Sequence, residues 1–260
     1  MSGNYTSDEM MTIEAARRLG DGRVCFVGIG LPSAAANLAL RTSGPNTALI
    51  YESGTIATRP DILPLSIGDP ELCDRALTTV SVPEMFRYWL QGGRIDVGFL
   101  GAAEIDRFGN INTTVIGSYA APKVRLPGAG GASEIAGSCG EVFVVMRQSA
   151  RTFVDRVGFI TSFGHGRGGD ARRAAGLMTK GPTLLVTDLC VMEPEADGHE
   201  FVVTALHPGV SRDAVSAATG WAVRFADTLK TTAAPSAAEL AILRTLHAHT
   251  AAAHTASVPA

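Results

Sequence analysis

The chain contains 260 residues, enough for one large α/β domain or two small ones with a sizeable buried core. Its 22 lysines and arginines nearly balance its 25 aspartates and glutamates, so the formal net charge of −3 gives no indication of a nucleic-acid or anionic-membrane partner. No segment approaches the roughly 18 uncharged apolar residues of a membrane helix, and the N-terminus lacks the pattern of a signal peptide, so we expect a cytoplasmic protein.

Helices and strands alternate in the first hundred residues. The capping-box sequence Thr6–Glu9 precedes apolar residues at helical spacing and predicts the first helix. A strand at 23–27 leads into a tight glycine turn, after which Ser33 is expected to cap an alanine-rich helix that ends near Arg41. Further elements are expected as strands at 48–51 and 95–100 and as a helix at 83–91.

Short strands dominate the second half, with a helix at 211–219 and a late helix opened by the capping box Ser236–Glu239. The strands are predicted at 141–146, 157–160, 183–187, 189–192 and 201–206. Early β–α alternation followed by clustered strands favours a single three-layer α/β domain over residues 1–250, with a mixed, mostly parallel sheet. The alanine-rich residues 251–260 are expected to form a frayed tail.

Four cysteines stand far apart in the sequence and form no C-x-x-C pair. They are Cys25, Cys73, Cys139 and Cys190. Apolar or small neighbours surround three of them, which predicts buried thiols in a reducing compartment rather than a disulfide framework or a zinc site. Histidine, aspartate and glutamate residues also show no metal-ligand spacing, so no metal centre is expected.

Gly28-Ile29-Gly30 is a glycine turn between a predicted strand and a predicted helix. It resembles a dinucleotide-binding fingerprint, but Ser33 stands where the third glycine of G-x-G-x-x-G would be needed. Nicotinamide binding therefore stays an alternative, which cofactor fluorescence would test. In either case, free N–H groups at the start of a helix present a site for an anion.

Gly128-Ala129-Gly130-Gly131 forms a second glycine-rich stretch. Glycines allow several backbone N–H groups to converge without side-chain obstruction, which suits a phosphate or a developing oxyanion. The stretch lacks the Lys-Ser/Thr ending of a nucleoside-triphosphate loop. The alternative interpretation is a flexible loop before a helix.

The segment from His165 to Arg173 is rich in glycine and arginine. A mobile basic loop of this kind is suited to contacts with the phosphates of a ligand. The alternative is a solvated surface loop without a binding role.

Glu52 directly follows an apolar strand and precedes Ser53-Gly54, which bend the chain. A carboxylate in an apolar setting loses hydration, so it is expected to be either paired or functional. The structural alternative is a salt bridge or capping contact with Arg59 or another neighbour. The functional hypothesis is a nucleophile at the carboxyl end of a strand, where open α/β sheets bind ligands.

Several motifs occur in the order in which they stand in one enzyme family. They are Gly28-Ile29-Gly30-Leu31-Pro32, Tyr51-Glu52-Ser53-Gly54, Leu65-Ser66-Ile67-Gly68-Asp69, Gly101-Ala102-Ala103-Glu104-Ile105-Asp106 with Gly109-Asn110-Ile111-Asn112, and Gly128-Ala129-Gly130-Gly131. With them the chain resembles β subunits of class I, glutaconate-type CoA-transferases, in particular the branch that acts on 3-oxoadipate. The resemblance covers nearly the whole chain, and the ordered set is more specific than any single glycine motif.

The resemblance implies a role for individual residues. Glu52 is expected to attack an acyl-CoA thioester and then to carry CoA as a covalent glutamyl thioester. The oxyanion contacts fall on Gly130 and Gly131 and on Ile29 and Gly30. Contacts with coenzyme A fall on Gly28, Gly101, Ala102 and Gly128. Coenzyme A enters as a substrate, so no permanently bound cofactor is expected. The chain carries E-S-G rather than E-N-G, so an asparagine role found in some relatives is absent.

The resemblance also implies a partner and a reaction. The chain is expected to be the catalytic half of a heteromer with a homologous α subunit, arranged as α2β2, that transfers CoA from succinyl-CoA to 3-oxoadipate. An acyl-CoA hydrolase on the same fold, with water as acceptor, is the nearest alternative enzyme. A non-catalytic ligand-sensing domain is the alternative from another class, but such proteins usually carry a helix-turn-helix, which we do not find in the sequence.

Overall fold

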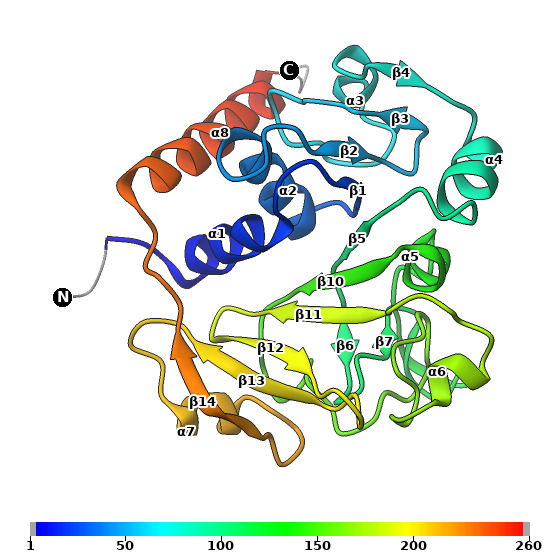
Figure 1. The fold of residues 1–260 in the computed structure, drawn as a ribbon. Helices are drawn as coiled ribbons and strands as arrows, with labels where there is room; N and C mark the ends of the chain where they lie inside the picture. The colour runs from blue at the N-terminus through cyan, green and yellow to red at the C-terminus, as the bar shows by residue number, and fades with distance from the viewer. Residues whose placement is uncertain (1–3, 257–260) are drawn as a thin grey trace.

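Ten strands form one mixed sheet in the computed structural model, which describes residues 4–256 (Figure 1). Their order is β14-β13-β12-β11-β10-β5-β1-β2-β3-β4, and β12 and β3 run against the direction of the other eight. The central strands β11, β10, β5, β1 and β2 are all parallel. This confirms the predicted single α/β domain with a mixed, mostly parallel sheet.

The strands of this sheet are short. They are β1 (Val24–Val27), β2 (Ala48–Ile50), β3 (Thr55–Ile56), β4 (Thr78–Thr79), β5 (Val97–Leu100), β10 (Glu141–Val145), β11 (Pro182–Val186), β12 (Cys190–Pro194), β13 (Phe201–Leu206) and β14 (Phe225–Thr231). The helices are α1 (Ser7–Leu19), α2 (Leu31–Arg41), α3 (Glu71–Asp74), α4 (Val82–Glu84), α5 (Ala132–Ser138), α6 (Ala171–Ala174), α7 (Arg212–Ala217) and α8 (Ala237–Ala256), together with a π-helix at Met85–Leu90.

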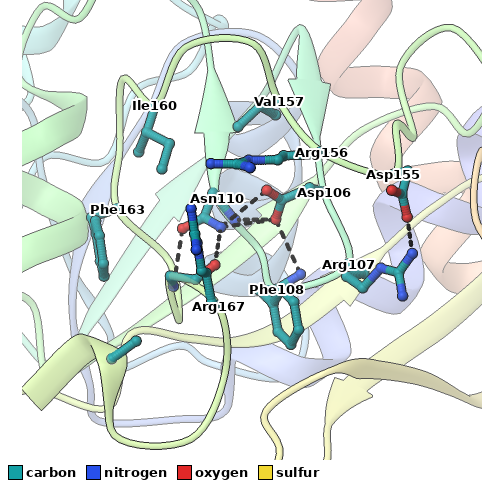
Figure 2. Close-up of a pocket in the computed structure, with 12 residues that line it drawn as sticks. Asp106, Arg107, Phe108, Asn110, Asp155, Arg156, Val157, Ile160, Phe163 and Arg167 are labelled. Carbon is teal, nitrogen blue, oxygen red and sulfur yellow. Dashed lines mark hydrogen bonds and ion pairs between the residues drawn. The ribbon is translucent and has the colours of Figure 1, made fainter.

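Two small hairpins lie outside the main sheet. They are β6 (Glu104–Ile105) with β7 (Ile111–Asn112), and β8 (Val115–Gly117) with β9 (Pro122–Arg125). The β6–β7 turn is closed by Asp106, whose carboxylate accepts hydrogen bonds from the backbone N–H groups of Phe108 and Asn110 at 3.1 Å (Figure 2). Turns that hold an aspartate in this way fix their own geometry.

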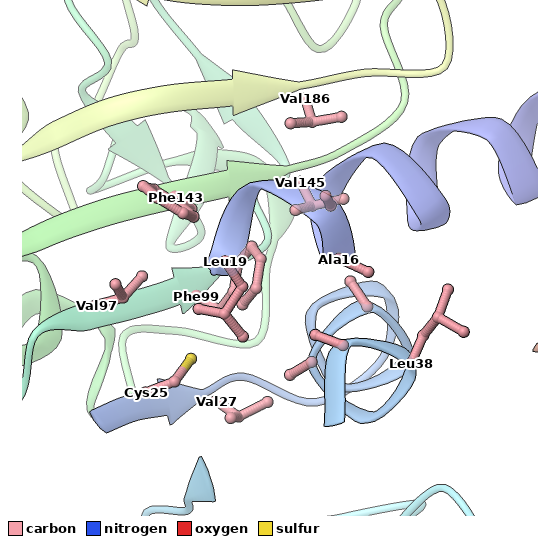
Figure 3. Packing of buried hydrophobic residues seen from close by; sticks show 14 of the residues in the cluster. Ala16, Leu19, Cys25, Val27, Leu38, Val97, Phe99, Phe143, Val145 and Val186 are labelled. Atoms are coloured by element: carbon pink, nitrogen blue, oxygen red, sulfur yellow. The ribbon is translucent and has the colours of Figure 1, made fainter. Parts of the chain in front are cut away.

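The hydrophobic core lies on both faces of the sheet, as a three-layer fold requires. Figure 3 shows the layer between the sheet and α1 and α2, to which the strands contribute Val27, Phe99 and Val145. Phe99 packs edge-on against Phe143 with ring centroids 5.6 Å apart. Each such fully buried side chain contributes about 1.5–3 kcal/mol to the free energy of folding.

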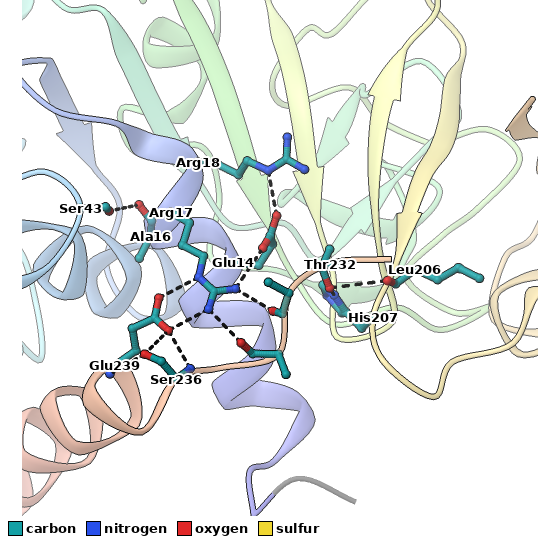
Figure 4. A network of polar contacts seen from close by, with 12 residues as sticks. Glu14, Ala16, Arg17, Arg18, Ser43, Leu206, His207, Thr232, Ser236 and Glu239 are labelled. Carbon is teal, nitrogen blue, oxygen red and sulfur yellow. Dashed lines mark hydrogen bonds and ion pairs between the residues drawn. The ribbon is translucent and has the colours of Figure 1, made fainter. Parts of the chain in front are cut away.

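A polar network fastens α8 to α1 (Figure 4). Arg17 donates two hydrogen bonds of 2.7 Å to the Glu239 carboxylate and one of 2.7 Å to the Ala233 carbonyl. Glu239 also accepts a hydrogen bond from the Ser236 backbone N–H, and the Ser236 hydroxyl oxygen accepts one from the Glu239 N–H, as the predicted capping box requires. The Arg17 guanidinium lowers the pKa of Glu239 to about 2. The start of the last helix is thus held to the first helix.

Several local predictions are wrong. Ser33 does not cap α2, which begins after Gly30 without a side-chain cap, because the Ser33 side chain is buried against Tyr51. Residues 157–160 form no strand, since the Val157 backbone N–H donates to the Asp106 carboxylate instead of to a neighbouring strand. The stretch 83–91 is helical as predicted, but most of it is the π-helix, which follows the short α4. The half-exposed β14 was not predicted.

The last helix continues to Ala256, past residue 251, where we expected a frayed tail to begin. Alanine has the highest intrinsic helix propensity, so the alanine-rich sequence extends the helix. Residues 257–260 lie outside the described residues. Within the described part of the chain, no helix is both long and apolar enough to cross a membrane.

Candidate active site

Glu52 lies in a tight turn directly after β2. The Gly54 N–H donates to the Tyr51 carbonyl at 3.0 Å, and the Val80 N–H donates to the Gly54 carbonyl at 2.9 Å. Gly54 has φ 99°, and a Cβ built there would collide with the Val80 carbonyl oxygen. Only glycine fits this position, so the E-S-G sequence bends the chain immediately behind the carboxylate.

A buried hydroxyl cluster anchors the residue before Glu52. The Tyr51 hydroxyl lies 2.9 Å from the Ser33 hydroxyl and accepts a hydrogen bond of 3.1 Å from the Asn37 amide, both on α2. Burial raises the pKa of Tyr51 to about 12, so the phenol stays neutral at physiological pH. This cluster fixes the end of β2 against α2 and therefore fixes the start of the Glu52 turn.

The second glycine stretch packs directly on the Glu52 carboxylate. A Cβ built on Gly130 would lie 3.8 Å from Oε2 of Glu52, and one built on Gly131 would lie 3.2 Å from its Cδ. The same Gly131 Cβ would lie 2.8 Å from Phe86 of the π-helix. Glu52 and this loop therefore lie against each other, and a side chain at Gly131 would displace the carboxylate.

Thr113, which follows β7, holds the glycine loop in place. The Gly128 N–H donates to the Thr113 carbonyl at 2.8 Å, and the Thr113 hydroxyl donates to the Gly128 carbonyl at 2.8 Å. The loop is thus ordered rather than flexible. It ends at Gly131, from which α5 begins.

The Glu52 side chain is half-buried, and within residues 4–256 it forms no ion pair and accepts no hydrogen bond. Arg59, the partner in the structural alternative, instead donates to the Pro45 carbonyl at 2.5 Å. The Glu104 carboxylate accepts a hydrogen bond of 2.7 Å from Asn112 and so is already engaged. Glu52 is available for chemistry in a way that these neighbours are not.

The other predicted site residues follow adjacent strands. Gly28 comes directly after β1 and Gly101 directly after β5, and the order β5-β1-β2 places both turns beside the Glu52 turn at the carboxyl edge of the sheet. Neighbouring strands lie about 4.8 Å apart. Gly28 approaches the Phe99 carbonyl closely, with an N–H···O distance of 3.0 Å. Ala102 is half-buried against the core.

The turn at Ile29 and Gly30 is partly accessible. Ile29 packs against the core cluster of α1 and α2, and a Cβ built on Gly30, which has φ 82°, would meet no atom within 4 Å. Their oxyanion role and the coenzyme A contacts of Gly28, Gly101, Ala102 and Gly128 stay predictions.

Sequence reasoning missed three supports of the site: Asn37, Thr113 and Phe86. Asn37 had a signal, because a fully buried asparagine within an alanine-rich helix needs a polar partner. Thr113 and Phe86 had none, since their partners lie far away in the sequence. Ser53 is a further neighbour whose buried hydroxyl has no hydrogen-bond partner among the described residues.

The four cysteines lie in different surroundings. Cys25, Cys139 and Cys190 are buried free thiols and Cys73 is exposed, which confirms the expectation of three buried thiols. Burial raises the pKa of Cys190 to about 12. In the part of the chain that the structure describes, no cluster of three or more His, Cys, Asp or Glu side chains is arranged to hold a metal ion.

A family model described as "Coenzyme A transferase" matches residues 9–218. The chain belongs to the coenzyme A transferase family. It is 66% identical over 250 residues to one subunit of the 3-oxoadipate CoA-transferase of Pseudomonas knackmussii, with 96% of each chain covered. It superposes on the crystal structure of glutaconate coenzyme A-transferase of Acidaminococcus fermentans with a TM-score of 0.87, at 30% identity, covering 93% of this chain and 94% of that one.

The same fold also serves other chemistry. The decarboxylase AibA/AibB superposes with a TM-score of 0.79 at 27% identity, covering 94% of this chain and 95% of that one. The fold alone therefore does not determine the reaction, and a reaction must be argued from the site.

Proposed function

We propose that the chain is the catalytic subunit of a CoA-transferase that moves CoA from succinyl-CoA to 3-oxoadipate through a covalent thioester on Glu52. One observation carries this proposal: a half-buried carboxylate at the carboxyl edge of the sheet, without a charge partner among the described residues, in contact with a glycine loop. The high identity to a subunit of 3-oxoadipate CoA-transferase supports the choice of acids.

The reaction proceeds through a series of covalent intermediates on Glu52. A Glu52 oxygen attacks the succinyl-CoA carbonyl, and the CoA thiolate leaves behind a mixed anhydride. The thiolate then attacks the glutamyl carbonyl, which releases succinate and leaves CoA on Glu52 as a thioester. The 3-oxoadipate carboxylate attacks this thioester, and the departing thiolate takes the 3-oxoadipyl group from the resulting anhydride. Glu52 returns as a carboxylate, so no resident cofactor is consumed.

Backbone N–H groups assist wherever an oxyanion develops. Gly130 and Gly131 lie against the Glu52 carboxylate, and Ile29 and Gly30 follow the adjacent strand. One such donor contributes about 3–4 kcal/mol to stabilisation of a transition state. Holding the carboxylate beside a bound thioester adds an effective molarity of about 10⁵–10⁸ M.

The anhydride requires exclusion of water, and this chain alone leaves Gly130 exposed. A homologous α subunit covering the site, in an α2β2 assembly, would provide the exclusion. The 66% identical relative is named as one subunit of its enzyme, and the decarboxylase AibA/AibB carries two names, which supports a partner of this kind. The hairpin β8–β9, with Tyr119 and Val124 exposed, leads into the glycine loop and offers apolar surface for it.

Borohydride trapping tests the nucleophile, because borohydride reduces thioesters and leaves free carboxylates intact. After incubation with succinyl-CoA, borohydride should inactivate the enzyme, and mass spectrometry should place the reduced residue at Glu52. Enzyme without succinyl-CoA is the control and should keep its activity. Reduction at Glu104 instead of Glu52 would overturn the assignment.

Product analysis separates transfer from hydrolysis. With succinyl-CoA and 3-oxoadipate, a transferase forms 3-oxoadipyl-CoA and succinate in equal amounts and releases little free CoA. A hydrolase releases free CoA at the same rate with or without 3-oxoadipate. Free CoA as the main product would exclude the transfer proposal.

A further inference from the structure

A cavity of about 640 Å³ lies apart from the Glu52 turn, between the β6–β7 turn, the segment 155–160 and the loop 163–167 (Figure 2). Small-molecule sites typically have volumes of about 300–1,000 Å³. Phe108, Val157, Ile160 and Phe163 provide much of the wall. The cavity thus has the volume and the apolar lining of a ligand site.

The floor of the cavity is built rigidly. Asn110 donates to both oxygens of Asp106 at 3.0 Å and to the Gly166 carbonyl at 2.8 Å. Its own carbonyl oxygen accepts from the N–H groups of Gly164 at 3.0 Å and Gly166 at 3.1 Å. Asp106 and Asn110 are 4% and 1% exposed. These two residues serve as a frame that holds the loop 163–167 against the β6–β7 turn.

Three arginines line the cavity, and they differ in their partners. Arg107 forms an ion pair with Asp155 and lies 4.0 Å from Glu200. Arg156 and Arg167 have neither an ion pair nor a hydrogen bond with any residue between 4 and 256. Figure 2 shows both side chains extending into the cavity beside Asn110. Two unpaired guanidinium groups that share one cavity repel each other and favour a bound anion.

The residues of the basic segment His165–Arg173 have two different roles: some are buried and hold the loop in place, and Arg167 lines the cavity. His165 and Arg172 are buried, and the Arg172 guanidinium donates to the carbonyls of Phe163 and Ala136 at 2.9 and 2.7 Å. The His165 N–H donates to the Phe108 carbonyl at 2.8 Å, so the loop is held in place rather than mobile. Arg167 is left to face the cavity.

We propose that this cavity, the arginine pocket (Arg156, Arg167 and the walls named above), binds the phosphate groups at the nucleotide end of coenzyme A. Arginine suits phosphate because its planar guanidinium donates two parallel hydrogen bonds. The aromatic side chains of Phe108 and Phe163 provide apolar surface for the adenine ring. The proposal rests on the function proposed above, since it concerns the same substrate.

The arginine pocket is joined to the reacting centre by β7. Asn110 lies in the pocket wall, and Thr113, three residues later, is hydrogen-bonded to Gly128 of the glycine loop. Three extended residues span about 10 Å. In coenzyme A the phosphates and the thiol stand at opposite ends of a long molecule. A phosphate subsite outside contact distance of Glu52, and rigidly connected to the glycine loop, matches that separation.

Binding of 3′,5′-ADP, the nucleotide end without the thiol, tests the pocket directly by calorimetry on the purified enzyme in its natural assembly. Arg156→Ala and Arg167→Ala should each weaken binding by about 10-fold, and the double variant by about 100-fold. Arg151→Ala is the matched control, because Arg151 is an exposed arginine outside the pocket wall. Ile160 is 43% exposed, so Ile160→Glu should fold normally while its carboxylate competes for the arginines.

Steady-state kinetics separate a role of the two arginines in substrate binding from a merely structural role. The arginine variants should raise KM for succinyl-CoA and leave kcat unchanged, because phosphate contacts are equally strong in the ground and transition states. Succinyl-pantetheine, which lacks the nucleotide, should react at the same rate with wild type and variants. Wild-type affinity for 3′,5′-ADP in the double variant, or an unchanged KM for succinyl-CoA, would overturn the proposal.

The Glu52 thioester and the arginine pocket can be refuted independently of each other. Arginine-dependent binding of 3′,5′-ADP without borohydride labelling of Glu52 would support the pocket and refute the Glu52 thioester. Labelling of Glu52 with unchanged 3′,5′-ADP binding in the double variant would support the thioester and refute the pocket.

Discussion

The two faces of the central sheet are built from different kinds of element. One face carries the long helices α1, α2 and α8, of 13, 11 and 20 residues, fastened by the Arg17 network. The other carries the seven-residue α5, the six-residue π-helix, two hairpins and the loops of the arginine pocket. Long helices satisfy most of their backbone groups internally, whereas short elements leave N–H groups and turns at the surface. We therefore expect the stability of the fold and its contacts with ligands to depend mainly on opposite faces.

Replacing Glu52 tests this division most strongly. Glu52→Ala should reduce CoA transfer by about 10⁴-fold or more, because it removes the proposed nucleophile. Glu52→Asp withdraws the carboxylate along the side chain and should cost roughly 10²-fold. Thermal unfolding of both variants should match the wild type. Substantial transfer by pure Glu52→Ala would show that another residue carries the acyl group.

Gly131→Val tests the contact between the glycine loop and the carboxylate. The added side chain meets both Phe86 and Glu52, so the loop must move away from the reacting centre. We expect kcat to fall by about 10²–10³-fold, as for loss of one oxyanion donor. Gly68→Val, at an exposed glycine with open surroundings, is the control. A rise in KM alone would mean that the loop only binds substrate.

His165 tests whether the face that carries the arginine pocket also contributes to the stability of the fold. Burial lowers the pKa of His165 from 6.5 to about 4, so the unfolded chain binds its proton first as the pH falls. The free energy of unfolding should therefore drop by about 2–3 kcal/mol between pH 6.5 and 4. His165→Gln keeps a donor for the Pro182 carbonyl and should reduce this slope, which denaturant titrations would measure. His247→Gln, at an exposed histidine, is the matched control.

Arg17 tests the opposite face, with the smallest expected effect. The lowered pKa of Glu239 adds stability above its ordinary pKa of 4.5, and that stability is lost as the pH falls toward 2. Because this pair lies near solvent, Arg17→Ala should cost only about 1 kcal/mol at pH 7 and flatten the acid slope. CoA transfer per folded molecule should not change. A loss of transfer in the folded variant would contradict the division between the faces.

Local signals predicted the first helix and the strand that ends at the Glu52 turn. The capping box Thr6–Glu9 and the apolar run before Glu52 appear as expected, with the Glu9 N–H 3.2 Å from the Thr6 hydroxyl oxygen. Gly54 also needs no distant information, since the E-S-G sequence alone signals a bend. These features depend on neighbours within a few residues.

Contacts between distant segments were not predictable in this way. Phe86 reaches Gly131 and Thr113 reaches Gly128 only because the sheet brings their segments together. Ser33 was expected from its position to cap α2, but its hydroxyl forms a buried hydrogen bond with the Tyr51 hydroxyl instead. The pairing of Arg107 with Asp155, which leaves Arg156 unpaired among the described residues, is likewise a property of the folded chain.

Because residues 85–90 form a π-helix, the position of the side chains depends on the number of residues in this segment as much as on their identity. Its bonds from the Gln91 N–H to the Phe86 carbonyl at 2.9 Å and from the Arg94 N–H to the Trp89 carbonyl at 3.0 Å close turns one residue wider than those of an α-helix. Deleting a single residue here would restore α-helical spacing and rotate Phe86 by about 100° relative to the residues that follow. The wall of Gly131 would then be supplied by another side chain. One inserted or deleted codon could therefore remodel the active centre without any substitution.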